Sequence, residues 1–68
     1  MVDGLKIKGL REMKNLTQAE LGSLVGAEQS MIGYVERGVK RPSVELLARI
    51  AEKLDTTVDE LLHKNKID

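Results

Sequence analysis

A polar segment at residues 28–34 and a basic segment at residues 37–41 carry the side chains best suited to molecular recognition. Amide, hydroxyl and phenol groups donate and accept hydrogen bonds, whereas arginine and lysine bind anions. This chemistry favours binding of a polar, negatively charged partner over bond breaking. The side chains are Gln29, Ser30 and Tyr34 in the first segment and Arg37, Lys40 and Arg41 in the second.

The other chemically active residues do not suggest a catalytic or metal site. Paired-carboxylate catalysis needs a pocket, and no pocket is expected around the acidic pairs. His63 has no Cys, Asp or His at ligand spacing. We therefore expect no catalytic residue, no metal, no cofactor and no small-molecule substrate, and a protein that is not an enzyme. The acidic pairs are Asp59 with Glu60 and Glu45 with Glu52.

Length and composition support this expectation. A chain of 68 residues, 41% hydrophobic and 32% charged, is typical of one small soluble domain. Such a domain has too little interior for both a core and a deep catalytic pocket. Because the chain has no cysteine, a disulfide-rich scaffold is excluded, and a cytoplasmic location is expected. The short apolar runs and the Met-Val-Asp start predict neither a membrane span nor a signal peptide.

The charges balance overall but are unevenly distributed. A net charge of zero argues against histone-like, nonspecific binding of nucleic acid. Residues 1–41 hold seven basic and five acidic groups, whereas residues 42–68 hold four and six. A polyanion would therefore meet the first part of the chain.

The first predicted helix covers residues 5–14 and is capped by Asp3 or Gly4. Gly9 within it indicates either close packing or simple tolerance, since glycine costs only about 0.5 to 1 kcal/mol relative to alanine. Its expected apolar face consists of Leu5, Ile7, Leu10 and Met13. The basic residues expected on its solvated face, with at most one or two touching phosphate, are Lys6, Lys8, Arg11 and Lys14.

A second helix is predicted to begin at Gln18. Thr17 with Glu20 forms a capping box, in which the hydroxyl and the carboxylate each satisfy a free backbone N–H. Gly26 ends the helix, because glycine tolerates the left-handed conformation that helix ends often need. Its expected apolar residues are Leu21, Leu24 and Val25.

A third helix is predicted at residues 28–36, after the turn, and Gly38 ends it. Gly22 has no side chain, so this helix can cross the second one closely. Two short helices that face each other across a tight turn form a helix-turn-helix pattern, here at residues 18–37. The apolar residues of the third helix are Ala27, Met31, Ile32 and Val35; those expected to point away are Gln29, Ser30, Gly33, Tyr34 and Arg37. Glu36 is expected to be structural.

A fourth helix follows Pro42 and Ser43, with Ser43 as its cap. Thr57 with Glu60 forms a second capping box, which predicts a fifth helix, and residues 64–68 are expected to be frayed. The fourth helix is expected to bury Val44, Leu47, Ile50, Ala51 and Leu54. The chain is thus expected to be a single all-α domain over residues 1–68. Three apolar residues near the end are expected either to pack against the first helix or to form a dimer seam: Leu61, Leu62 and Ile67.

The sequence resembles the Cro and phage-repressor type of helix-turn-helix, also described as XRE-like or lambda-repressor-like DNA-binding domains. The matching stretches are L-R-E-M-K-N-L-T-Q-A-E-L at 10–21, E-R-G at 36–38, R-P-S at 41–43, and I-A-E-K-L with V-D-E-L-L within 50–62. Together and in order, these stretches are specific for the family. The resemblance implies a compact five-helix domain of prokaryotic or phage type that reads double-stranded DNA with its third helix.

The resemblance also implies roles for individual residues. The leading base reader is Gln29, because glutamine can pair bidentately with adenine and contribute about 1 to 3 kcal/mol of discrimination. Gln18 is implied to touch phosphate and to brace the third helix. The implied base-reading residues are Glu28, Gln29, Ser30, Gly33 and Tyr34. The implied phosphate contacts are Thr17, Gln18, Arg37, Lys40 and Arg41.

Two residues depart from the family pattern. Glu28 replaces the usual Ser or Thr cap, and its carboxylate would either repel phosphate or accept a hydrogen bond from cytosine N4. Gly33 replaces a longer polar side chain, so that either one base contact is lost or the backbone approaches the DNA.

The implied function is that of a small transcriptional regulator, a repressor that occupies a two-fold operator as a homodimer. One helix reads too few base pairs for genomic specificity, whereas two half-sites about 34 Å apart roughly square the specificity ratio. The alternative is a protein-interaction module, namely an antitoxin, a bridging factor or an anti-repressor partner. The zero net charge and Glu28 favour this alternative, while the few residues after Leu62 argue against its antitoxin form. In the plainest interpretation, the polar side chains and the basic segment are simply solvated.

Overall fold

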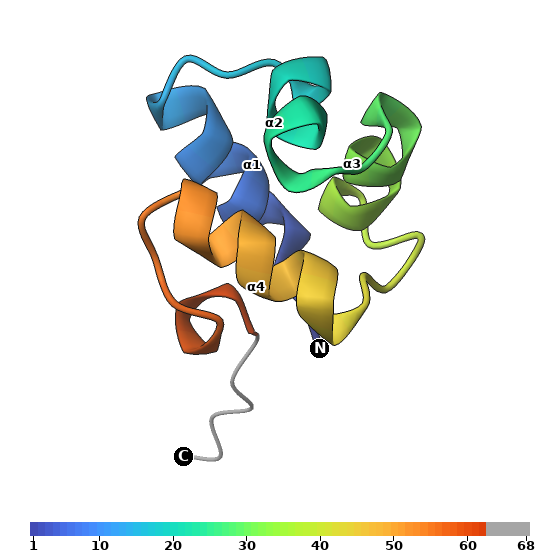
Figure 1. Ribbon diagram of the computed structural model, residues 1–68. Coiled ribbons are helices and arrows are strands. Elements are labelled where there is room, and N and C mark those ends of the chain that lie inside the picture. Colours follow the sequence, from blue (N-terminus) through green and yellow to red (C-terminus); the bar gives the residue numbers. More distant parts are fainter. Residues whose placement is uncertain (63–68) are drawn as a thin grey trace.

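The computed structural model describes residues 1–62, which form four α-helices and one turn of 3-10 helix (Figure 1). The elements are α1 (Gly4–Met13), α2 (Gln18–Val25), α3 (Gln29–Glu36), α4 (Val44–Lys53) and the 3-10 turn η1 (Asp59–Leu61). The all-α prediction is confirmed for this part of the chain, but the count of five helices is wrong. The predicted frayed end, His63 and Ile67 lie outside the described residues.

The expected fifth helix is only the single turn η1, because its end pairs with the start of the chain. The Thr57 hydroxyl accepts from the backbone N–H of Glu60 at 3.2 Å, as a capping box requires. The Glu60 carboxylate instead accepts from Lys6 Nζ at 3.3 Å. Leu62 is extended and forms an isolated antiparallel bridge with Val2. The chain therefore leaves the helical conformation after one turn.

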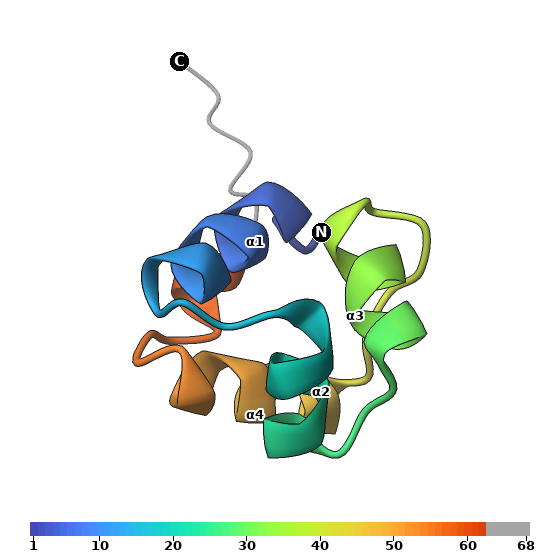
Figure 2. The ribbon, with the colours of Figure 1, turned by 90° about the horizontal axis from the view of Figure 1, so that it is seen from above.

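The core lies between α1 and α4, which occupy opposite sides of it, and α3 lies at one end (Figures 1 and 2). The helix α2 packs against α3 and α4, while α1 packs against α3 and η1. The core is aliphatic, as the sequence predicts. Its buried members are Ile7, Leu21, Val25, Ile32, Val35, Leu46, Leu47, Ile50, Ala51, Leu54 and Leu61.

The predicted caps of α1, α2 and α4 are confirmed. The Asp3 carboxylate accepts from a backbone N–H of the first turn of α1 at 3.0 Å. Both bonds of the first capping box are present, because Thr17 Oγ1 accepts from Glu20 N at 3.0 Å and Thr17 N donates to Glu20 Oε1 at 2.8 Å. The Ser43 hydroxyl caps α4 at 3.0 Å. Gly26 ends α2 with a left-handed φ of 73°.

The predicted apolar face of α1 is partly wrong. The residues that α1 buries are Gly4, Ile7 and Arg11, whereas Leu5 and Met13 are 77% and 79% exposed. Arg11 is only 7% exposed, so its predicted place on the solvated face is also wrong. A β-carbon at Gly4 would lie 2.3 Å from the Glu36 carbonyl oxygen, and this close approach turns α1 toward the end of α3.

Smaller corrections concern α2 and α4. Leu24 is 49% exposed, because α2 buries the face that carries Leu21, Gly22 and Val25. Val44 is 83% exposed, so the covered stripe of α4 begins only at Leu46 and Leu47. A β-carbon at Gly9 would have nothing within 4 Å, which favours simple tolerance of this glycine over close packing. None of the helices within residues 1–62 is long and apolar enough to cross a membrane.

Candidate nucleic-acid interface

The turn between α2 and α3 is tight because the two backbones touch. A β-carbon at Gly22 would lie 2.5 Å from the carbonyl oxygen of Ala27, closer than real side chains come. The Ala27 N–H donates to the Gly22 carbonyl at 2.9 Å, which closes the turn. Any larger residue at position 22 would therefore push α3 away from α2. The predicted role of Gly22 is confirmed.

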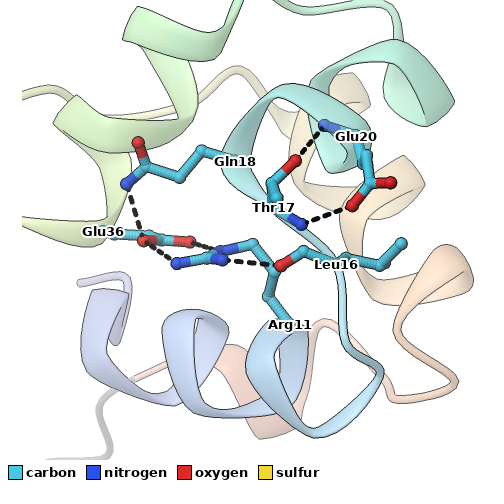
Figure 3. A network of polar contacts seen from close by, with 6 residues as sticks. All are labelled: Arg11, Leu16, Thr17, Gln18, Glu20 and Glu36. Carbon is cyan, nitrogen blue, oxygen red and sulfur yellow. Dashed lines mark hydrogen bonds and ion pairs between the residues drawn. The ribbon is translucent and has the colours of Figure 1, made fainter.

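A buried ion pair fixes the end of α3 to α1. Arg11 Nε donates to Glu36 Oε2 at 2.6 Å, and Arg11 Nη2 donates to Glu36 Oε1 at 3.1 Å (Figure 3). Arg11 Nη1 also donates to the carbonyl of Leu16 at 2.7 Å. The hydrogen bond to Glu36 is the main cause that raises the pKa of Arg11, against the opposing effect of burial. We call Arg11, Leu16, Gln18 and Glu36 the buried junction.

Gln18 joins this junction from the first residue of α2. Its Nε2 donates to Glu36 Oε1 at 3.1 Å. The oxygens of a carboxylate accept hydrogen bonds, so the amide nitrogen of Gln18, which is a donor, must face Glu36. Its Oε1 points away from the junction, as Figure 3 shows. Gln18 therefore braces α3, as predicted, and the structural role expected for Glu36 is confirmed.

The outer side of α3 carries a hollow of about 280 Å³. Four predicted base readers and two predicted phosphate contacts line it together. Because the polar side chains come from α2, from α3 and from the residue that ends α3, the hollow depends on the turn and on the buried junction. The lining residues are Gln18, Gln29, Ser30, Gly33, Tyr34 and Arg37. We call this surface the α3 hollow.

Tyr34 brings the basic segment back toward the α3 hollow. The guanidinium carbon of Arg37 lies 5.4 Å from the centre of the Tyr34 ring, and Lys40 Nζ lies 4.9 Å from it. Both distances fall within the range of cation–π attraction. A surface with hydrogen-bonding groups on a helix and cations directly beside it suits a polyanion that also presents polar edges.

Comparison with known proteins agrees with this geometry. A family model described as helix-turn-helix matches residues 7–61. The chain belongs to the helix-turn-helix family. It is 39% identical over 61 residues to the HTH-type transcriptional regulator AnsR of Bacillus subtilis, a match that covers 90% of this chain and 53% of AnsR. The chain thus spans about half the length of this relative.

Solved structures of other helix-turn-helix proteins share the fold. The P22 c2 repressor in complex with a synthetic operator superposes with a TM-score of 0.87 at 31% identity, covering 91% of this chain and 94% of the repressor chain. SinR, described as the master regulator for biofilm formation and solved in complex with DNA, gives a TM-score of 0.81 at 31% identity, with 88% and 97% covered. The resemblance to phage repressors is therefore confirmed.

The remaining predicted residues of this helix-turn-helix chain lie around the α3 hollow rather than in it. Glu28 is the exposed N-cap of α3, and its side chain makes no capping hydrogen bond. The Thr17 side chain is engaged in the capping box. Lys40 and Arg41 line a second groove of about 450 Å³ with the first residues of the chain, among them the exposed Met1 and Leu5, and Arg37 borders both this groove and the α3 hollow.

Sequence reasoning missed two features of the helix-turn-helix interface. The sequence does contain a signal for the burial of Arg11. Arg11 follows Gly4 and Ile7 at helical spacing and therefore lies on the same face of α1. The contact of Tyr34 with Arg37 could also be expected from the sequence, since residues three apart are neighbours on a helix surface. Within residues 1–62, no group of His, Cys, Asp or Glu side chains is arranged to hold a metal ion.

Proposed function

We propose that this helix-turn-helix chain is a sequence-specific DNA-binding transcriptional repressor that inserts α3 into the major groove. The observation that carries the proposal is the α3 hollow, in which five polar or small residues of α3 and its C-cap meet Gln18 of α2. The major groove, about 12 Å wide, admits an α-helix and presents a distinct pattern of donors and acceptors for each base pair. The similarity to the P22 c2 repressor solved with a synthetic operator and to SinR solved with DNA supports the same function.

The N-terminal part of α3 reads base edges in this proposal. Gln29 and Ser30 are exposed in the first turn, where family members contact bases. Gln29 pairs with adenine N6 and N7, and Ser30 adds a hydroxyl that serves either as donor or as acceptor. Gly33 and Tyr34 face the DNA one turn further along, and Glu28 lies beside them as the N-cap.

The phosphates are bound on both sides of α3. Thr17 and Gln18 lie at the N-terminus of α2, where free N–H groups and the helix dipole favour an anion. Lys40 and Arg41 lie in the exposed segment after α3. Such contacts set the position and orientation of the protein on the duplex without specifying sequence. Arg37 is the third cation of this segment.

The proposal includes a homodimer on a two-fold operator. A single α3 reads only a few base pairs, and the specificity ratio that a genome demands is larger than one half-site supplies. Two copies related by a two-fold axis place their recognition helices one helical turn apart, about 34 Å.

Selection of bound duplexes from a random pool tests the proposal. The pool consists of duplexes of roughly 30 base pairs at about 100 mM salt, so that nonspecific phosphate binding is moderate. We expect an enriched inverted repeat with half-sites about one turn apart. Enrichment of a lone half-site would contradict the dimer but support base reading. Binding without enrichment, or no binding, would favour the protein-interaction alternative, for which the groove beside Met1 and Leu5 offers an exposed apolar surface.

Two variants separate base reading from phosphate binding. Gln29→Ala is expected to relax the preference at one base pair by about 1 to 3 kcal/mol and to leave binding of scrambled duplexes unchanged. Arg41→Ala is the control, and it is expected to weaken binding of every duplex alike. Equal losses of Gln29→Ala on the selected and the scrambled duplex would contradict the assignment.

A further inference from the structure

The recognition helix has a gap at Gly33, and the side chain of Arg37 fills it. A β-carbon at Gly33 would lie 3.1 Å from Arg37 Nη1, and 3.5 Å from Gln18 Oε1. Arg37 is four residues further along, and side chains on a helix lean back toward the preceding turn. The guanidinium therefore lies directly against the place on α3 where a side chain of residue 33 would begin.

The ring of Tyr34 lies beside this guanidinium, and within residues 1–62 no ion pair engages it. The Tyr34 ring lies 5.4 Å from the guanidinium carbon, and stacking on an aromatic ring suits the planar arginine head better than the lysine ammonium. Among residues 1–62, no carboxylate forms an ion pair with Arg37, in contrast to Arg11. Arg37 lines the α3 hollow together with Gln29 and Ser30. Its donors are therefore directed to the surface that the proposed function assigns to bases.

We propose that Arg37 reads a guanine in the major groove, through the gap at Gly33, rather than binding a backbone phosphate. Guanine presents two acceptors there, O6 and N7, and the guanidinium fork matches them bidentately. Lys40 and Arg41, which lie outside the α3 hollow, remain as phosphate contacts. This inference rests on the proposed function, since it requires α3 to enter the major groove.

A charge-conserving pair of variants tests the inference. The selection is repeated with Arg37→Lys and, as the matched control, with Arg41→Lys in the same basic segment. We expect the wild-type half-site to contain a guanine whose preference falls by a factor of between about 5 and 150 in Arg37→Lys, the range for loss of one bidentate base contact. Arg41→Lys is expected to keep that preference. The salt dependence of binding should stay the same in both variants, because neither changes the charge.

The outcomes distinguish this inference from the proposed function. An enriched site whose base preferences are the same in wild type and Arg37→Lys would overturn the role of Arg37 and leave the proposed function intact. If the wild type enriches no sequence, the proposed function fails, and the inference fails with it.

Gly33→Ala tests the gap without changing Arg37. The added methyl group would lie 3.1 Å from Arg37 Nη1, tighter than an ordinary contact, so the guanidinium must shift slightly away from α3. Alanine is the better helix former, so the melting temperature by circular dichroism is not expected to fall. We expect loss of the same guanine preference, with the preference due to Gln29 retained. An unchanged guanine preference in folded Gly33→Ala would overturn the proposed route through the gap.

Discussion

Glu36 and Arg37 are neighbours in the chain, and their surroundings are opposite. Glu36 is 5% exposed, and it accepts hydrogen bonds from Arg11 and Gln18 in the buried junction. Arg37 is exposed, and its contact is with the ring of Tyr34. A buried charge has to be paired, whereas an exposed one remains available to a partner. The comparison separates charges that hold α3 in place from charges that act outside the domain.

The largest effect is expected from breaking the buried junction. Arg11→Met leaves the Glu36 carboxylate buried without its cation, which typically costs about 3 to 5 kcal/mol of folding free energy. A small domain is stabilised by only about 5 to 15 kcal/mol, so the melting temperature should fall strongly. Urea denaturation of wild type and variant measures the difference.

A double variant serves as the control for that prediction. Arg11→Met with Glu36→Leu removes both charges, and buried pairs replaced by apolar residues are often neutral in stability. The double variant should therefore be more stable than Arg11→Met alone. If Arg11→Met alone proved as stable as wild type, the ion pair would not hold α3 in place, and the contrast drawn between Glu36 and Arg37 would be wrong.

The next largest effect concerns Thr17, the N-cap of α2, which lies in the chain between Leu16 and Gln18 of the buried junction. Thr17→Ala removes the hydroxyl of the capping box and is expected to cost about 0.5 to 2 kcal/mol. Thr17→Ser keeps the hydroxyl and should restore most of this loss. Thermal melts of the two variants decide this, and equal melting temperatures for alanine and serine would rule out a capping contribution.

A variant of Lys40 tests the role of the exposed charges that follow α3. Lys40→Ala should change stability by less than about 0.5 kcal/mol, since surface substitutions usually do. Binding to every duplex should weaken alike, and the slope of log K against log salt should fall by about 0.9 for one lost phosphate contact. Fluorescence anisotropy at several salt concentrations gives the slope. An unchanged slope would remove Lys40 from the phosphate contacts.

The smallest effect is expected at an exposed ion pair away from α3. Lys14 Nζ donates to the Asp55 carboxylate, and this hydrogen bond, with the lysine charge, lowers the pKa of Asp55. The stabilisation is complete above about pH 4, the ordinary aspartate pKa, and is lost as the pH falls through the lowered folded-state value. Asp55→Asn should therefore be slightly less stable than wild type at neutral pH and equally stable at strongly acidic pH. A stability difference that persisted in acid would assign the effect to another cause.

The features that could be predicted from the sequence are those fixed by residues close in the chain. The capping box joins Thr17 and Glu20, three residues apart, and Gly26 ends its own helix. The burial of Arg11 depends on Glu36, which is 25 residues away. The missing fifth helix depends on the bridge between Val2 and Leu62. Hydrophobic spacing grouped Leu5 and Met13 with the buried face of α1 and so assigned Arg11 to the wrong face, because the spacing of Arg11 from Gly4 and Ile7 is not hydrophobic.

The candidate interface follows the same rule. The residues of the α3 hollow were all named from the sequence, because they lie on α3, at its C-cap or at the first position of α2, within one helix-turn-helix pattern. The contact of Tyr34 with Arg37 was not predicted although the two residues are three apart on α3, and the contact with Lys40 was not predicted because it depends on the path of the chain after α3.

Backbone contacts at Gly4 and Gly22 have a consequence for how the sequence preference of such a domain can change. Near one end of α3, α1 approaches the Glu36 carbonyl at Gly4, and at the other, α2 approaches the Ala27 carbonyl at Gly22. Neither contact involves a side chain of the outer face. Residues 29, 30 and 37 can therefore be exchanged while α3 keeps its orientation. Under the proposed function, the domain can then come to recognise new operators through substitutions of these base-contacting side chains alone, while the backbone arrangement of the helices stays the same.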